Sequence, residues 1–341
     1  MNEWNGLSFL HIPFFPSWPL TRSKVKVLAM TSKTGDLKLI KTLWGIDDPI
    51  SPTLFKSIKE EEGYHGVEVI RLAWLFDRDL LVRSLNESGL AVVCQLHTAG
   101  GYIDQDTSEY VYCGAYDVKS HEDDLQKQLE ECKELLSLVE AGGFINIHAG
   151  VDAWSTKEAV EFLEVALKKI DDIVPNVQVT IETHRQRLFG NPFQTRDILS
   201  SMPATLLSKL NLNADLSHWY CACERVFNPD EERDAIWWPE LISLLSERCR
   251  YIHARFGWAQ GPQMADPSAK ECDSERMLQL NVWKTLMQEQ KKRNIDTFVC
   301  PEYGPQPYLP VMPHSQEPVA SLPEAVSYTK RVIEDLFESI S

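Results

Sequence analysis

The sequence contains no uninterrupted apolar run of about 18 residues, so we expect no transmembrane helix. It has no run of lysine and arginine longer than three residues, and its net charge is −16. Because proteins that bind nucleic acid neutralise phosphates with such residues, we expect no nucleic-acid partner. A Gly-x-Gly-x-x-Gly loop and a Walker-type phosphate loop are both missing. Their absence disfavours the open, doubly wound sheets that bind nucleotides.

Cysteine pairs at the spacing of a zinc site are also missing. The chain has eight cysteines, and the pair Cys221 and Cys223 is not followed by a second pair at that spacing. The first part of the chain has an early glutamate and several prolines but no basic leading region, so we expect no signal peptide. These features predict a cytoplasmic protein with reduced thiols.

What is present is a regular alternation of short apolar or β-branched runs with longer amphipathic segments. Strands are predicted over residues 38–46, 65–72, 90–96, 144–148, 177–182, 210–215, 251–255 and 297–302. Helices are predicted over residues 51–62, 77–88, 120–141, 155–173, 195–201, 238–246, 274–292 and 322–339. Eight strand–helix units are typical of a closed parallel sheet. We therefore predict a single-domain (β/α)8 TIM barrel over residues 37–341, preceded by an N-terminal extension, residues 1–36, with a candidate strand at 24–30.

The active site of such a barrel lies at the carboxyl ends of its strands, and here those ends are unusually polar. The residues concerned are His97, His148, Glu182, Asp215, His253 and Glu302. One such residue alone is as easily a solvated strand end as a ligand, but four consecutive strands that end in ligand types favour a site. Carboxylates with one imidazole suit Mn²⁺, Mg²⁺, Co²⁺ or Zn²⁺. Without a cation, three carboxylates this close would repel one another.

Six short motifs resemble a known group of barrels. They are GYHGVE at 63–68, IHAG at 147–150, IETH at 181–184, ADLSH at 214–218, YIHAR at 251–255 and CPEYG at 300–304. Their order and spacing, over residues 38–340, resemble the xylose isomerase-like superfamily. That group includes sugar isomerases and epimerases, keto-inositol dehydratases and DNA-repair enzymes of the endonuclease IV type.

The resemblance implies one divalent metal ion, with Mn²⁺ favoured, and an isomerase or epimerase that acts on a sugar, ketose or related polyhydroxylated carbonyl compound. Its metal ligands would be Glu182, Asp215, His253 and Glu302. Glu182 and Glu302 would also be the acid/base pair that removes and returns an α-proton through an enediolate. The residues expected to contact the substrate are His97, His148, His184, His218 and Arg255.

Other activities remain open. The same proton abstraction begins a lyase reaction, so the ligand set does not separate an isomerase from a keto-inositol or dehydroshikimate-type dehydratase or a C-glycoside-cleaving enzyme. A phosphodiester hydrolase of the endonuclease IV type would need an Asp-x-His after the seventh strand, and none is present there. Where the epimerases carry a further glutamate after the first ligand, residues 184–187 read His-Arg-Gln-Arg. The expected partner is therefore a small molecule, with no membrane; a homo-oligomer is compatible with the sequence.

Aromatic residues crowd the loops that follow the predicted strands. They include Trp154, Trp219, Tyr220, Phe256, Trp258, Tyr303 and Tyr308. Such side chains either pack helices onto the barrel or line a pocket that stacks on a sugar ring, and the sequence favours neither alternative.

Overall fold

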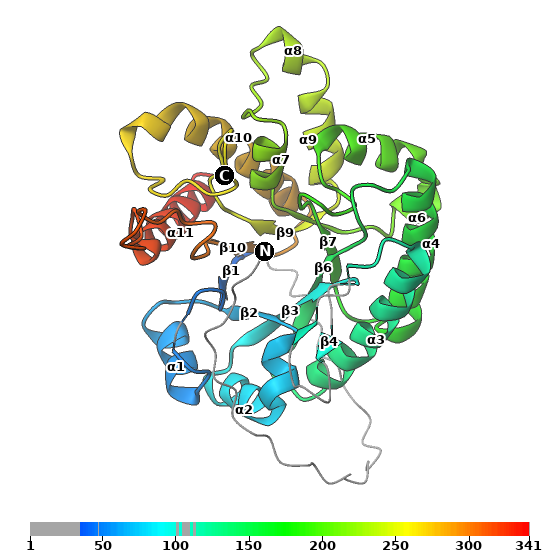
Figure 1. Ribbon diagram of the computed structural model, residues 1–341, viewed down its shortest axis with the longest axis vertical. Helices are drawn as coiled ribbons and strands as arrows, with labels where there is room; N and C mark the ends of the chain where they lie inside the picture. Colours follow the sequence, from blue (N-terminus) through cyan, green and yellow to red (C-terminus); the bar gives the residue numbers. More distant parts are fainter. Residues whose placement is uncertain (1–34, 47, 100–101, 104–109, 112–113, 341) are drawn as a thin grey trace.

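The computed structural model describes residues 35–46, 48–99, 102–103, 110–111 and 114–340. Within these residues, eight parallel strands close into a barrel in the order β1-β10-β9-β8-β7-β6-β3-β2 (Figure 1). The strands are β1 (Leu37–Thr42), β2 (Gly66–Ile70), β3 (Ala91–His97), β6 (Gly143–His148), β7 (Val179–Glu182), β8 (Leu212–Ala214), β9 (Cys249–His253) and β10 (Thr297–Cys300). This architecture confirms the predicted (β/α)8 barrel.

The long helices form an outer ring around the strands, and each overlaps the range predicted for it (Figure 1). They are α1 (Pro52–Glu60), α2 (Leu72–Ser88), α3 (Val118–Leu136), α4 (Thr156–Ile173), α5 (Pro192–Ser201), α9 (Trp238–Ser246), α10 (Asp273–Lys292) and α11 (Leu322–Glu338). The candidate strand at 24–30 lies outside the described residues. Among the helices that the structure describes, none is both long and apolar enough to cross a membrane.

Several short elements were not predicted. They are the antiparallel pair β4 (Tyr102–Ile103) and β5 (Tyr110–Val111), the helices α6 (Ala204–Leu207), α7 (Ser217–Ala222) and α8 (Glu232–Ala235), and the 3-10 turn η1 (Lys270–Cys272). All of them interrupt loops between strands and long helices. They are too short to show a hydrophobic period, which is the signal that revealed the longer elements.

Local signals explain where the helices begin. The Ser51 hydroxyl accepts a hydrogen bond from the Leu54 amide, and a proline occupies the first turn of α1. At the start of α4, Ser155 and Glu158 form a reciprocal capping box. These caps satisfy amide groups that the first helical turn leaves without partners.

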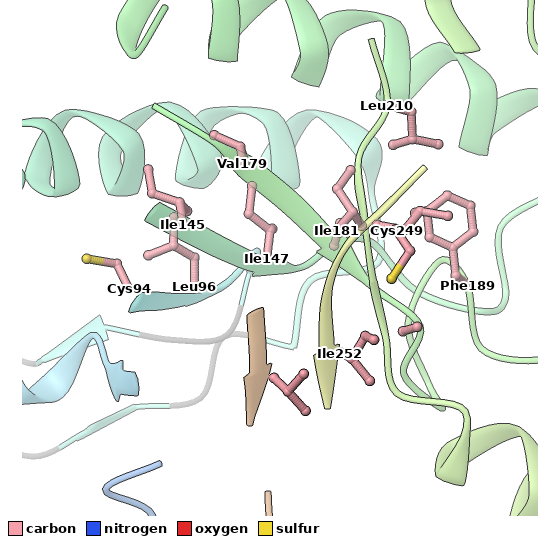
Figure 2. Close-up of a cluster of buried hydrophobic side chains, with 14 of the residues drawn as sticks. Cys94, Leu96, Ile145, Ile147, Val179, Ile181, Phe189, Leu210, Cys249 and Ile252 are labelled. Carbon is pink, nitrogen blue, oxygen red and sulfur yellow. The ribbon is translucent and has the colours of Figure 1, made fainter. Parts of the chain in front are cut away.

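Side-chain alternation along the strands divides the barrel into an outer and an inner core. Outward side chains such as Ile145, Ile147, Val179 and Ile181 belong to the larger hydrophobic cluster between strands and helices (Figure 2). Inward side chains form a second apolar cluster, made of Ile40, Val93, Phe144, Tyr251, Phe298 and Cys300. Further along the same strands the inward residues are polar. The apolar cluster therefore lies beneath the polar carboxyl end of the barrel interior and forms its floor.

We expect Gly143→Ala to weaken the contact between β3 and β6. A methyl group at Gly143 would meet the Val92 carbonyl oxygen at 2.1 Å, and this backbone atom cannot turn aside as a side chain can. The free energy of unfolding, measured by urea denaturation, should fall by about 1–3 kcal/mol.

Gly261→Ala is the matched control. Its nearest neighbour would be Nε1 of Trp258 at 3.0 Å, and that side chain is 46% exposed and can move. The control should stay within about 0.5 kcal/mol of the parent protein. Equal losses in the two variants would contradict the tight packing of Gly143.

Candidate metal centre

The strand register brings the polar strand ends to one buried place. Neighbouring strands align His97 with His148, Glu182 with Asn213, and Cys300 with His253. The four predicted ligands are 0–6% exposed: Glu182, Asp215, His253 and Glu302. Buried charges of this kind require partners of opposite charge or a bound cation.

The imidazole of His253 lies at the centre of the predicted ligands. Its Nδ1 atom is 3.3 Å from Oε2 of Glu302, 3.5 Å from Oε2 of Glu182 and 4.0 Å from Oδ2 of Asp215. One ring nitrogen therefore faces three carboxylates, which come from β7 and from the loops after β8 and β10.

Glu68 on β2 is a site residue that the sequence-based prediction missed. Its Oε2 atom accepts hydrogen bonds from Nε2 of His253 and from the Tyr251 hydroxyl, both at 3.0 Å. This bond fixes the imidazole so that Nδ1 points at the three carboxylates. The available signal was a single acidic residue in the otherwise apolar strand GVEVI.

Neutral donors hold Glu182. Its Oε2 atom accepts from Nδ2 of Asn146 at 2.6 Å and from Nδ2 of Asn213 at 3.1 Å, and it lies 2.9 Å from Nε2 of His148. Its other oxygen, Oε1, is buried and accepts no hydrogen bond from the part of the chain that the structure describes. One oxygen is thus fixed while the other is available.

Arg255 lies among the predicted ligands. Its guanidinium binds Oδ2 of Asp215 at 2.5 Å and Oε2 of Glu302 at 2.8 Å, and Nε donates to the Ser217 hydroxyl at 3.2 Å. The Tyr308 ring covers the guanidinium at 5.0 Å. Arg255 therefore neutralises part of the acidic cluster, and its contact with a substrate stays a prediction.

The pKa values follow from burial and from these partners. Burial raises the pKa of Glu182 and that of Asp215 to about 7. Burial acts in the same direction on Glu302, but His253 and Arg255 hold the pKa of that carboxyl far below its usual range. Burial disfavours charged His253, yet the carboxylates of Glu68, Glu302 and Glu182 raise its pKa well above the ordinary value.

The four other predicted histidines form a row beside the carboxylates. Ring centroids are 4.3 Å apart for His97 and His148, 4.4 Å for His148 and His184, and 3.7 Å for His184 and His218. Burial lowers the pKa of each of the four well below its ordinary value, so their rings are neutral near pH 7.

The aromatic side chains after the strands include both residues that pack helices onto the barrel and one residue that covers the site. Trp154 and Trp219 are buried, and their indole groups donate to the backbone carbonyls of Tyr116 and Phe189, as packing residues do. Tyr308 instead covers the site, and its ring meets Trp44 edge-on at 4.7 Å. A side chain at Gly304 would strike the Trp44 ring at 2.2 Å, so this cover is tightly fitted.

The donor set has the chemistry of a metal site. Ligand atoms of Asp215, His253 and Glu302 all lie within 4.8 Å of one another, as do those of Glu182, Asp215 and His218. Oε1 of Glu182 and Nδ1 of His253 are buried and form no hydrogen bond within the described residues. A divalent cation would satisfy both atoms and offset the carboxylate repulsion, so these residues fit such an ion.

Arg255→Gln should destabilise the protein in the presence of a chelator. Removing the guanidinium leaves the buried carboxylates of Asp215 and Glu302 uncompensated, a loss of about 3–5 kcal/mol in the free energy of unfolding. Arg78→Gln is the control, because Arg78 pairs with Glu134 at the surface and should contribute at most about 1 kcal/mol. Similar unfolding midpoints for both variants in urea would show that Arg255 does not neutralise the cluster.

No protein-family model matches the sequence, and no curated protein matches it. The structure is similar to that of the IolI protein with a bound zinc atom (TM-score 0.54, 12% identity, 89% of this chain and 99% of that chain). It is also similar to the 3-keto-D-glucoside 4-epimerase YcjR from E. coli (0.51, 13%, 87% and 100%). A third similar structure is a xylose isomerase domain protein from Alicyclobacillus acidocaldarius (0.50, 12%, 89% and 98%). The chain therefore has the fold of the xylose isomerase-like barrels that its motifs resemble.

Proposed function

We propose that this chain is a divalent-metal-dependent isomerase or epimerase that acts on a sugar, ketose or related polyhydroxylated carbonyl compound. The observation that carries the proposal is the buried set of three carboxylates around one imidazole. In it, Oε1 of Glu182 and Nδ1 of His253 form no hydrogen bond within the described residues. The names of two similar structures, a zinc-containing protein and a keto-glucoside epimerase, support it.

Glu182, Asp215, His253 and Glu302 would hold the metal ion. Three hard oxygen ligands and one imidazole suit Mn²⁺, the ion we favour, and also Mg²⁺, Co²⁺ or Zn²⁺. When bound, the ion supplies Lewis acidity that polarises a carbonyl and makes the neighbouring C–H bond more acidic. Glu68 keeps the His253 ring in the orientation that this set requires.

Glu182 and Glu302 are suited to move the proton. In the barrel, β7, which carries Glu182, and β10, which precedes Glu302, lie on opposite sides of β9, which carries His253. One carboxylate removes the α-proton, and the other returns a proton to the opposite face of the same carbon. Asn146 and Asn213 orient Glu182, whereas Arg255 orients Glu302.

The histidine row offers substrate contacts that complement the carboxylates. His148, His184 and His218 are neutral, so their ring nitrogens can donate to or accept from the hydroxyl groups of a polyol. Nδ1 of His218 is buried and has no hydrogen-bond partner among the described residues, which leaves it available for such a bond. A substrate bound among these buried side chains would be largely removed from bulk water.

Metal-free protein should bind about one equivalent of Mn²⁺. A ligand that binds only the folded state stabilises it by about 2.7 kcal/mol at 100 times its Kd, so Mn²⁺ should raise Tm and a chelator should lower it. Asp215→Asn should weaken binding more than about 100-fold, since it removes a proposed ligand.

Asp171→Asn is the control for the metal experiment, because Asp171 pairs with Lys209 at the surface. It should bind Mn²⁺ as the parent protein does. Calorimetry that detects no Mn²⁺ binding, together with a Tm that is indifferent to chelator, would refute the metal site.

Glu182→Gln and Glu302→Gln should each slow α-proton exchange by about 100- to 10,000-fold. The measurement is deuterium incorporation next to the carbonyl of a ketose panel, followed by NMR at saturating Mn²⁺. Glu161→Gln, an exposed position on α4, should exchange at the parental rate. Undiminished exchange in either variant would remove that residue from the acid/base pair, and elimination products would indicate the lyase instead.

A further inference from the structure

Arg185 is a cation at the rim of the site, and no carboxylate of the described residues forms an ion pair with it. Within the described part of the chain, its side chain makes two contacts: one with Sγ of Cys221 at 3.6 Å and one with the face of the Tyr308 ring at 5.2 Å. By contrast, Arg255 binds two carboxylates, and Arg187 donates to the carbonyl oxygens of Thr98 and Gly150. Arg185 therefore differs from Arg255 in having no carboxylate partner among the described residues.

The backbone ties Arg185 to the histidine row. Its carbonyl oxygen accepts a hydrogen bond from Nδ1 of His184 at 2.6 Å. A turn closed by the Arg187 amide and the His184 carbonyl follows, with Gln186 at a positive φ of 63°. Arg185 is therefore held beside the row by local structure and does not sit on a free surface loop.

Tyr308 connects Arg185 with the candidate metal centre. The guanidinium carbon of Arg255 lies 5.0 Å from the centre of the Tyr308 ring, and that of Arg185 lies 5.2 Å from it. The two guanidinium groups thus share one aromatic ring. Through this ring, Arg185 adjoins the arginine that binds Asp215 and Glu302.

A cavity opens beside Arg185. Its volume is about 660 Å³, and Arg185, Asn191, Cys221 and Gln260 contribute to its wall. Asp152 and Glu224 also line it, and neither forms an ion pair with Arg185. Two acidic side chains on the wall disfavour a doubly charged phosphate more than a singly charged carboxylate, since each repels an anion in proportion to its charge.

We propose that Arg185 binds a carboxylate at the end of the substrate opposite its carbonyl group, so that the enzyme acts on acidic sugars. A planar guanidinium forms paired hydrogen bonds with a carboxylate, and a partly buried position strengthens them. The inference rests on the proposed function, which supplies the carbonyl end, and it adds the substrate class.

The test compares three probes with the Mn²⁺-loaded full-length protein: D-glucuronate, D-glucose and glucose 6-phosphate. Calorimetry should show that glucuronate binds about 10- to 100-fold more tightly than glucose, with the phosphate weaker than glucuronate. Arg185→Gln should abolish the preference for glucuronate and leave glucose binding unchanged. Arg196→Gln, a nearby surface arginine on α5, should keep the preference.

A purely structural role for Arg185, as a support for Tyr308, predicts another pattern. Arg185→Gln would then weaken both sugars equally, and that result would overturn the proposal. Equal binding of glucuronate and glucose to the parent protein, no binding of glucuronate, or an Arg185-dependent preference for the phosphate would also overturn it. If Mn²⁺ fails to bind while the Arg185-dependent preference persists in chelator, the metal-dependent function is refuted and the carboxylate subsite stands.

Discussion

Four carboxylates share the buried end of the barrel with one imidazole and one guanidinium. Glu68, Glu182, Asp215 and Glu302 bring more negative charge than His253 and Arg255 can balance. Like charges at such distances raise one another's pKa unless a cation intervenes. Several features of the site offset this excess of negative charge. They are the hydrogen bonds of Glu68 and Glu182, the position of Arg255 and the raised pKa of His253.

The barrel makes the arrangement possible because each acidic group comes from a different strand or from the loop after it. A parallel sheet points alternate residues inward, so the apolar floor of Phe144 and Tyr251 and the polar end above it come from the same strands. Distribution over the strands lets the long outer helices and the outer core supply the stability.

The barrel and most of its polar strand ends could be predicted from the sequence, because both follow from the periodicity of side chains along a strand. The strands and their polar ends follow from the period of two, and this placed Glu182 and Asp215. Glu68 was missed because one acidic residue inside an apolar strand indicates a buried charge but not its partner, which is His253. The contacts of Arg255 were also beyond sequence reasoning, since a long side chain can reach several neighbours. Tyr308 contacts both Arg185 and Arg255, but it lies in an irregular loop whose sequence has no hydrophobic period from which its position could be predicted.

Gly304 and Trp44 lie near opposite ends of the described chain, yet the indole leaves no space for a side chain at residue 304. They flank the seam where β1 pairs with β10 and the barrel closes. Glu302 lies two residues before this contact, and β10 pairs with β1 at the seam and with β9, which carries His253, on its other side. Bringing the first and last strands together costs chain entropy before their contacts repay it. The last strand thus both closes the barrel and places Glu302 beside His253.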